Sequence, residues 1–306
     1  MTYQAAAPPD TLAKIVHPDT LQHAVGSAAA EHGGKFEFTH LFDHIKDSRE
    51  LEIPFGHVEI PSFPPIRVAG MEIDLSITRH VVFMWFAAFL LIIAAVSAAR
   101  SYRKKPVPKG FANFFEVLVL FIRDEVAIPN MGRGGIKYLP YLLTTFFFIL
   151  IMNLLGLFPY GATPTGNVAV TAGLATISFI MIQVASIRSQ GFLHYLAHLT
   201  GGVPWFLWPI MIPIEIIGLF TKPFALCIRL FANMTGGHLV ILSLIGLIFI
   251  FQSYAIAPVP IIFVVGINLL ELFVGFLQAY IFTMLTSLFM GMGMQTESHG
   301  NDHDHG

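Results

Sequence analysis

Hydrophobic residues in this chain gather in five long stretches separated by polar segments. The first three stretches are residues 80–99, 138–158 and 167–187. About 20 apolar residues in an α-helix cross the ~30 Å hydrocarbon core of a bilayer. These stretches therefore predict three transmembrane helices.

Two further apolar stretches, roughly 204–252 and 256–292, are much longer. As one helix the first would extend about 70 Å, more than twice the hydrocarbon thickness. It could form two spans that turn at Gly236-Gly237, or one steeply tilted helix bent at its prolines. No polar break occurs before Gln252-Ser253-Tyr254, so we favour two steeply tilted helices that form a hairpin near residues 252–259. Such tilt requires a protein partner for support.

Residues 110–128 have a mixed pattern. Apolar side chains recur at helical spacing: Phe111, Phe114, Phe115, Leu118 and Ile122. A full span would bury the charges of Glu116, Arg123, Asp124 and Glu125. This segment is therefore predicted to be an amphipathic helix on the cytoplasmic surface.

Positive charge after the first span sets the orientation. Arg100, Arg103, Lys104, Lys105 and Lys109 follow it directly, and clusters of this kind stay on the cytoplasmic side. The N-terminal segment is then outside and, with five spans, the C-terminal tail is inside. No cleaved signal peptide is evident at the N-terminus.

Composition agrees with a membrane protein. Hydrophobic residues make up 55% of the 306 residues and charged residues only 12%, whereas soluble domains carry about 25% charged residues. The predicted fold class is an all-α integral membrane protein with five transmembrane helices and the surface helix. A formal net charge of −2 gives no indication of nucleic acid binding. The single cysteine, Cys227, excludes an internal disulfide and matches no metal-ligand spacing.

Both ends of the chain are polar. Residues 1–75 are predicted to be a partly ordered extramembrane segment, with a short element at 36–42, and residues 293–306 a disordered tail. Histidines occur in both. Their spacing matches no standard zinc site, so metal binding is the weaker interpretation there.

Charged residues are scarce in the membrane region, 76–292. Between Leu139 and Thr296 the acidic and basic residues, histidines aside, are Arg188, Glu215, Lys222, Arg229 and Glu271. A guanidinium in hydrocarbon costs at least ~2.5–3.5 kcal/mol, so Arg229 is expected to be paired structurally or to serve an ion path. Glu215, Lys222 and Arg229 are seven residues apart and share one helical stripe, with Asn233 one turn beyond.

His238 lies nine residues after Arg229, on the opposite side of a straight helix. A hairpin with its turn near residue 255 places His238 opposite Glu271, and Gln278 follows Glu271 on the same face. A His–Glu pair at membrane depth can relay protons. A buried ion pair without proton traffic is the alternative. Asn153 and Gln183 are buried amides for which interhelical hydrogen bonds suffice.

The run from Lys222 to His238, Lys-Pro-Phe-Ala-Leu-Cys-Ile-Arg-Leu-Phe-Ala-Asn-Met-Thr-Gly-Gly-His, resembles the signature of the subunit a family of F-type ATP synthases. Glu215-Ile-Ile-Gly lies at the matching upstream spacing. The motifs Asn153-Leu-Leu-Gly-Leu-Phe-Pro and Glu271 through Phe282 are also similar to that family. The resemblance covers about residues 75–292.

The resemblance implies a bacterial inner-membrane stator subunit that passes protons through two aqueous half-channels to the carboxylates of a rotating c ring. Arg229 would face those carboxylates. The proton path would be lined by Glu215, Asn233, His238, Glu271 and Gln278. Many bacterial members have an acidic residue at position 238 and a histidine at position 271, so the pair looks exchanged here. The c ring, the subunit b stalk, other synthase subunits and lipid are the implied partners.

Other classes of membrane protein fit less well. A secondary transporter would show an internal repeat and a channel a filter sequence, and neither is found. A structural scaffold leaves Arg229, His238 and Glu271 unexplained. No Gly-rich nucleotide-binding motif occurs, so the chain is expected to be non-catalytic, without a cofactor or metal of its own. Protons are favoured over sodium as the coupling ion because a His–Glu relay suits them.

Overall fold

We describe the protein from a computed structural model. The structure describes residues 50–53, 56–59, 66–68, 71–73, 78–104, 110–158, 163–193, 195, 205–251 and 258–294. The N-terminal element expected at 36–42, most of the N-terminal histidines and residues 295–306 of the expected C-terminal tail lie outside these residues.

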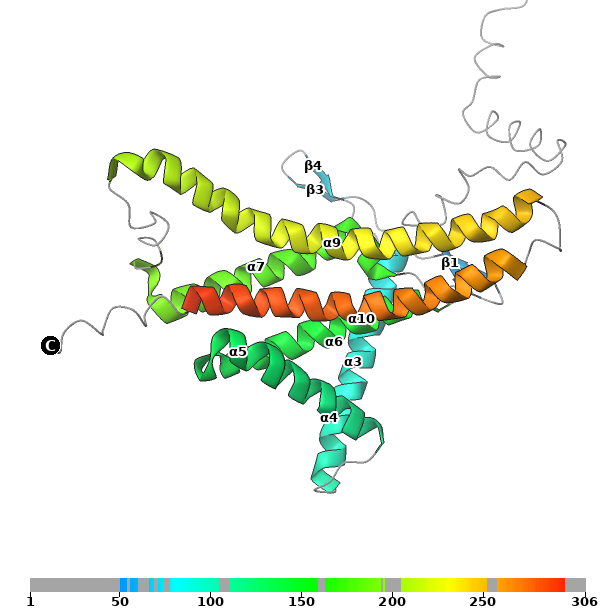
Figure 1. Ribbon diagram of the computed structural model, residues 1–306, viewed down its shortest axis with the longest axis horizontal. Helices are drawn as coiled ribbons and strands as arrows, with labels where there is room; N and C mark the ends of the chain where they lie inside the picture. The colour runs from blue at the N-terminus through cyan, green and yellow to red at the C-terminus, as the bar shows by residue number, and fades with distance from the viewer. Residues whose placement is uncertain are drawn as a thin grey trace, which may run out of the picture.

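Five helices have the length and apolarity to cross a membrane, as the hydrophobic pattern predicted (Figure 1). They are α3 (Arg79–Lys104), α6 (Leu139–Gly156), α7 (Val168–Gln190), α9 (Trp208–Phe251) and α10 (Pro258–Met294). The all-α membrane domain is confirmed, with each helix beginning and ending within a few residues of the expected range.

Four short strands precede the first span, which the sequence pattern did not predict. β1 (Glu50–Ile53) pairs antiparallel with β2 (Gly56–Glu59), and β3 (Ile66–Val68) pairs antiparallel with β4 (Met71–Ile73). Two-stranded hairpins of three or four residues per strand carry too little alternation to be recognised from the sequence.

The long stretch 208–251 forms one helix, not two spans. α9 has 44 residues and continues through Pro213, Pro223 and the Gly236-Gly237 pair without a break. Its length of about 66 Å exceeds the hydrocarbon thickness twofold. In Figure 1, α9 and α10 both run along the length of the molecule, close together in the middle and on the right and further apart on the left, and α3 crosses them steeply.

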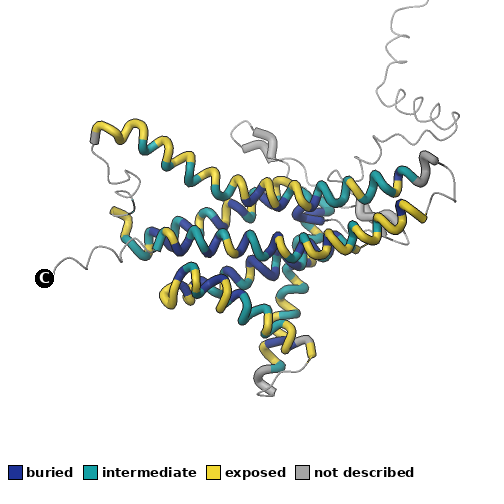
Figure 2. Tube along the Cα trace, in the orientation of Figure 1, coloured by how far each residue is buried: buried dark blue, intermediate teal, exposed yellow. Residues whose placement is uncertain are grey.

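The packed centre of the molecule is α6. In its most apolar stretch 50% of the residues are buried, against 11% for α9. Figure 2 shows the same contrast, with buried positions along α6 and the middle of α10 and exposed ones along α9. Phe146 and Leu142 of α6 are fully buried, and Phe146 meets Phe276 of α10 edge-on.

The segment expected to be an amphipathic helix is α4 (Phe111–Phe121), continued by the π-helical turn η2 (Ile122–Ala127) and the short α5 (Ile128–Met131). Part of its apolar face packs on protein. Phe115 stacks on Phe147 at 4.3 Å between ring centroids, and Ile122 and Val126 are fully buried. Its charges point outward, where the hydrogen bond from Arg123 holds the pKa of the Asp124 carboxyl below its ordinary value. Its place at a membrane surface remains a prediction.

Small residues let α10 approach η2 and α5 closely. The Ser287 hydroxyl donates to the carbonyl oxygen of Val126 at 3.1 Å. A Cβ added to Gly291 would lie 1.9 Å from the carbonyl oxygen of Asn130. Backbone atoms cannot yield as a flexible side chain can, so only glycine fits at position 291.

We therefore expect Gly291→Ala to lower stability, by about 1–3 kcal/mol as for overpacked cores. The measurement is the thermal unfolding midpoint of the protein in detergent. Gly266→Ala, on the same helix with nothing within 4 Å of the added Cβ, is the matched control and should be neutral or stabilising. Equal midpoints for the two variants would contradict the packing.

Candidate functional site

Polar side chains of α9 meet partners on α10 at regular levels along the antiparallel pair. His238 Nδ1 lies 2.9 Å from Glu271 Oε1. Asn233 Nδ2 donates to Gln278 Oε1 at 2.9 Å. These contacts confirm the register that the predicted hairpin gave, with residue 238 opposite about 272. We call this row of contacts the α9–α10 seam.

The carboxylate of Glu271 is enclosed. The residue is only 5% exposed, and its atom Oε1 would lie 3.1 Å from a Cβ built on Gly237. Glycine at 237 thus leaves room for the carboxylate to reach His238 on the next position of α9. Gly237 serves this close approach, and the Gly236-Gly237 pair does not form a turn. Among described residues, the second carboxylate oxygen, Oε2, has no hydrogen-bond partner.

The pair Asn233 and Gln278 continues the seam one level further along α9 and α10. Gln278 is 2% exposed, and its Nε2 atom has no partner within the described part of the chain. Buried polar atoms nearly always have a partner in native proteins. Among the described residues, the seam therefore contains a buried amide donor at Gln278 and a buried carboxylate oxygen at Glu271 that have no hydrogen-bond partner.

Arg229 lies on the outer face of α9. Leu226 and Leu230 beside it are buried, whereas Arg229, Ile228 and Ala232 are exposed. Within the described residues, the guanidinium has no hydrogen bond or ion pair. His238 points instead to α10, so the two side chains face different ways, as their nine-residue separation predicted.

The stripe of Glu215, Lys222 and Arg229 does not act as one cluster. Lys222 is half-buried, with its Nζ 4.9 Å from the centre of the Phe289 ring on α10. Glu215, on α9, is half-buried near Tyr195, which lies in the connection between α7 and α9. Seven-residue spacing places the three residues on one stripe of α9, but each of the three side chains lies in a different environment.

Tyr195 was not identified from the sequence. Its hydroxyl donates to Gln183 Oε1 of α7 at 2.6 Å, so the buried amide is bonded to the connection and not to another span. Burial raises the pKa of the Tyr195 phenol, and the charge of Glu215 raises it further. A tyrosine in a short polar link carries no sequence signal that distinguishes it from an interfacial side chain.

Asn153 connects α6 to the seam. It is fully buried, donates through Nδ2 to the carbonyl oxygen of Gly275 on α10 at 3.0 Å, and accepts from Thr165 Oγ1 at 2.7 Å. The expected interhelical hydrogen bond of this amide is confirmed. Thr165 belongs to the short turn η4 (Pro164–Gly166).

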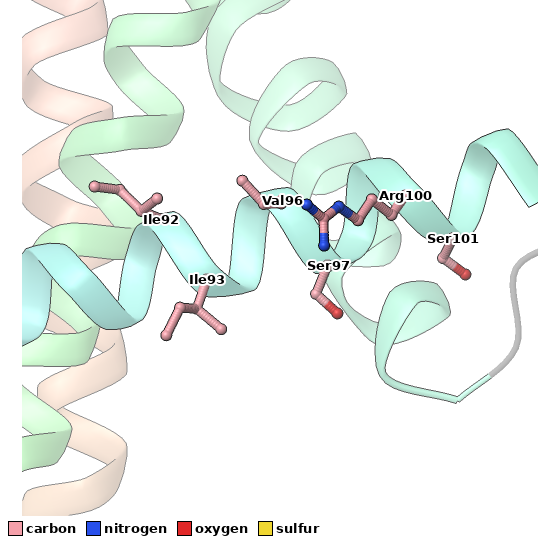
Figure 3. A pocket seen from close by; sticks show the side chains of 6 residues that line it. All are labelled: Ile92, Ile93, Val96, Ser97, Arg100 and Ser101. Carbon is pink, nitrogen blue, oxygen red and sulfur yellow. The ribbon is translucent and has the colours of Figure 1, made fainter.

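Two hollows in the described structure lie away from the His238–Glu271 contact. One, of about 720 Å³, lies between α7 and α9 and is lined mainly by apolar side chains, such as Phe179 and Phe220. The other, of about 510 Å³, follows the outer face of α3 from Ile92 to Ser101 (Figure 3). The first hollow is almost wholly apolar and the second is lined by a single helix, so the seam is the stronger candidate for the site.

The side chains of the seam are of types that can transfer protons. Histidine and carboxylate groups can both take up and release a proton, and His238 and Glu271 are in direct contact within an apolar helix pair. A fixed cation on the neighbouring outer face would attract an arriving carboxylate and favour its ionised form. In the part of the chain that the structure describes, no group of three histidine, cysteine or acidic residues could hold a metal ion.

Comparisons with known proteins give one consistent result. The family model "ATP synthase A chain" matches residues 81–291, more than half of the chain. A protein named ATP synthase subunit a from Pelodictyon phaeoclathratiforme is 52% identical, over 100% of this chain and 89% of its own length. Proteins of that name from Chloroherpeton thalassium and Myxococcus xanthus are 53% and 54% identical, over 86% and 76% of this chain and 79% and 78% of their own lengths.

Proposed function

Because the chain belongs to the ATP synthase A chain family, and is thus a membrane-sector subunit of an F-type ATP synthase, we propose that it passes protons to and from a rotating ring of c subunits. Two aqueous half-channels deliver protons to the ring carboxylates and release them on the other side. The observation that carries the proposal is Arg229, a cation with no described partner on the uncovered face of an apolar helix. The chain itself is non-catalytic, and it resides in a bacterial inner membrane.

The uncovered face of α9 favours a protein partner that carries acidic groups. Ile214 is 56% exposed and Val240 47%, and both lie within about 60° of Arg229 around the helix. Lipid would cover the apolar side chains but would leave the guanidinium in hydrocarbon at a cost of at least ~2.5–3.5 kcal/mol. A ring with one carboxylate per subunit covers the apolar face and pairs the cation in turn. Subunit b of the stalk would hold the chain against rotation.

Polar groups on either side of Arg229 support two separate half-channels. Towards the α9–α10 connection lie Asn233 with Gln278 and then His238 with Glu271. Towards the other end lies Glu215, 14 residues or about 21 Å before Arg229 along α9. Arg229 between the two sets blocks direct leakage, so each proton must travel on the ring. Each crossing then yields ~2.3 kcal/mol per 100 mV of membrane potential.

The orientation follows from the charge pattern. The positive cluster at the C-terminal end of α3, from Arg100 to Lys109, indicates that this end of the helix lies in the cytoplasm. The α9–α10 connection and the His238–Glu271 pair then lie towards the outside, and Glu215 lies towards the cytoplasm. His238 and Glu271 are accordingly assigned to the outer half-channel and Glu215 to the inner one.

Replacing Arg229 by alanine should lower proton-driven ATP synthesis in inverted membrane vesicles at least about 100-fold, equivalent to ~2.7 kcal/mol, with the complex still assembled. Lysine should restore little, because it lacks the planar, permanently charged guanidinium. Ile228→Ala, on the same exposed face, is the matched control and should retain near-normal rates. Near-normal synthesis by assembled Arg229→Ala would sink the proposal.

His238 and Glu271 should act as one unit. Each alanine variant should slow proton pumping roughly tenfold, and the double variant should be little slower than either, because contacting residues are non-additive. The exchange His238→Glu with Glu271→His should retain more activity than either half of it alone. Multiplicative losses in this cycle would argue that the two residues contribute independently.

The two chain ends should be accessible from opposite sides of the membrane. In a Cys227→Ser background, cysteines introduced at Thr20 and at Ser298 should react with an impermeant thiol reagent from the outside and the cytoplasmic side, respectively. The odd number of spans requires this result. Labelling of both positions from one side would contradict the orientation and the assignment of the half-channels.

A further inference from the structure

We propose that Thr163 is a positioning residue of the proton path, whose hydroxyl holds the His238 ring so that Nδ1 stays directed at Glu271. Thr163 precedes η4 in the connection between α6 and α7. The inference rests on the proposed function, because it assigns His238 a part in proton movement. It adds a residue from outside the two long helices that form the seam.

The His238 ring is held at both nitrogens. Nδ1 lies 2.9 Å from Glu271 Oε1, and Nε2 lies 3.4 Å from Thr163 Oγ1. A ring with a single contact could turn about its side-chain bonds and lose its alignment with the carboxylate. Two contacts on different sides of the ring fix its plane. Thr163 is 6% exposed, so its hydroxyl has few alternative partners.

A hydroxyl suits a histidine that changes its protonation state. It carries one donor hydrogen and accepts through its lone pairs. When the neutral ring has its proton on Nδ1, the Thr163 hydroxyl donates to Nε2. When both nitrogens are protonated, the hydroxyl rotates and accepts from Nε2–H. The ring can therefore gain and lose a proton without losing its contact or its direction towards Glu271.

The turn that carries Thr163 is fixed to the surrounding helices. The Thr165 hydroxyl donates to Asn153 Oδ1 of α6 at 2.7 Å, and the Thr235 hydroxyl of α9 donates to the carbonyl oxygen of Gly166 at 3.4 Å. Within the turn, Gly166 N–H donates to the Thr163 carbonyl oxygen at 2.9 Å. The Thr163 side chain is thus presented to His238 from a fixed backbone.

Gly156 leaves the space that this side chain occupies. A Cβ added at the end of α6 on Gly156 would lie 1.9 Å from Thr163 Oγ1 and 2.8 Å from its Cβ. Any larger residue at 156 would displace the hydroxyl that reaches His238. The glycine of the Asn153-Leu-Leu-Gly motif is therefore needed because a side chain at position 156 would collide with Thr163.

The test is the rate of proton-driven ATP synthesis by the complete enzyme complex in inverted vesicles, normalised to assembled complex. Thr163→Val removes the hydroxyl with little change of shape, and should slow synthesis roughly threefold to tenfold, the range that one hydrogen bond gives. Thr163→Ser keeps the hydroxyl and should restore the rate to within about twofold of the wild type. Thr163→Ala, which adds no atoms, replaces the valine variant if that variant does not assemble.

Two comparisons separate positioning of His238 from general packing. In a His238→Ala background, Thr163→Val should cause no further loss, since the ring that it positions is gone. Thr165→Val changes a residue of the same turn whose hydroxyl is bonded to Asn153 and not to His238. Whatever loss of rate it causes in the wild-type background should appear in full in the His238→Ala background. A full additional loss from Thr163→Val without the histidine would overturn the proposal, as would a serine variant as slow as the valine variant.

Arg229→Ala and His238→Ala, measured in the same vesicles, distinguish the two levels of inference. If both retain wild-type rates, the proposed proton path itself fails. If both lose activity while Thr163→Val retains the wild-type rate, the path stands and the positioning role of Thr163 is wrong.

Discussion

The cost of a polar group without a partner in hydrocarbon is the constraint on which the structure of this chain depends. α9 and α10 are apolar along most of their length, yet they carry an arginine, a lysine, two glutamates, a histidine and several amides. Antiparallel pairing of the two helices brings Asn233 to Gln278 and His238 to Glu271. The same pairing that gives each of these four side chains a partner sets them in a row, and the proposed proton path uses this row.

Small residues bring the helices close enough for these short side chains to meet. Gly237 makes room for the Glu271 carboxylate, Gly156 for the Thr163 hydroxyl, and Gly291 for the carbonyl oxygen of Asn130. In a membrane, helix association gains nothing from burying apolar surface away from water, so close packing and interhelical hydrogen bonds must supply it. Glycine therefore has two effects here: it lets backbones approach, and it lets polar groups reach partners on other elements.

The outer face of α9 is not covered by any part of the chain that the structure describes. Its apolar side chains and Arg229 point away from the rest of the protein, whereas α6 is enclosed on several sides. Helices longer than the bilayer is thick have to tilt, and a tilted pair needs lateral support. A curved partner protein with acidic groups would support the tilted helices and would also pair with Arg229. Within the proposed function, one surface thus serves for assembly and for proton exchange.

The sequence by itself determined the five apolar stretches and, for a hairpin with its turn near residue 255, the opposition of His238 to Glu271. These follow from hydrophobic length and from the fixed 1.5 Å rise of a helix, which are local or nearly local properties. It also isolated Arg229, because charge is scarce in the membrane region. Only the tertiary structure decided that α9 runs unbroken through Gly236-Gly237 and that Lys222 lies over Phe289. It also decided that Thr163 reaches His238 of α9 and that Tyr195 reaches Gln183 of α7. A glycine pair in a sequence is compatible with a turn or with a close helix contact. The hydroxyl of a loop threonine can form a hydrogen bond with any polar group within reach. The choice depends on which atoms other segments bring to that position, and spacing along one chain does not contain that information.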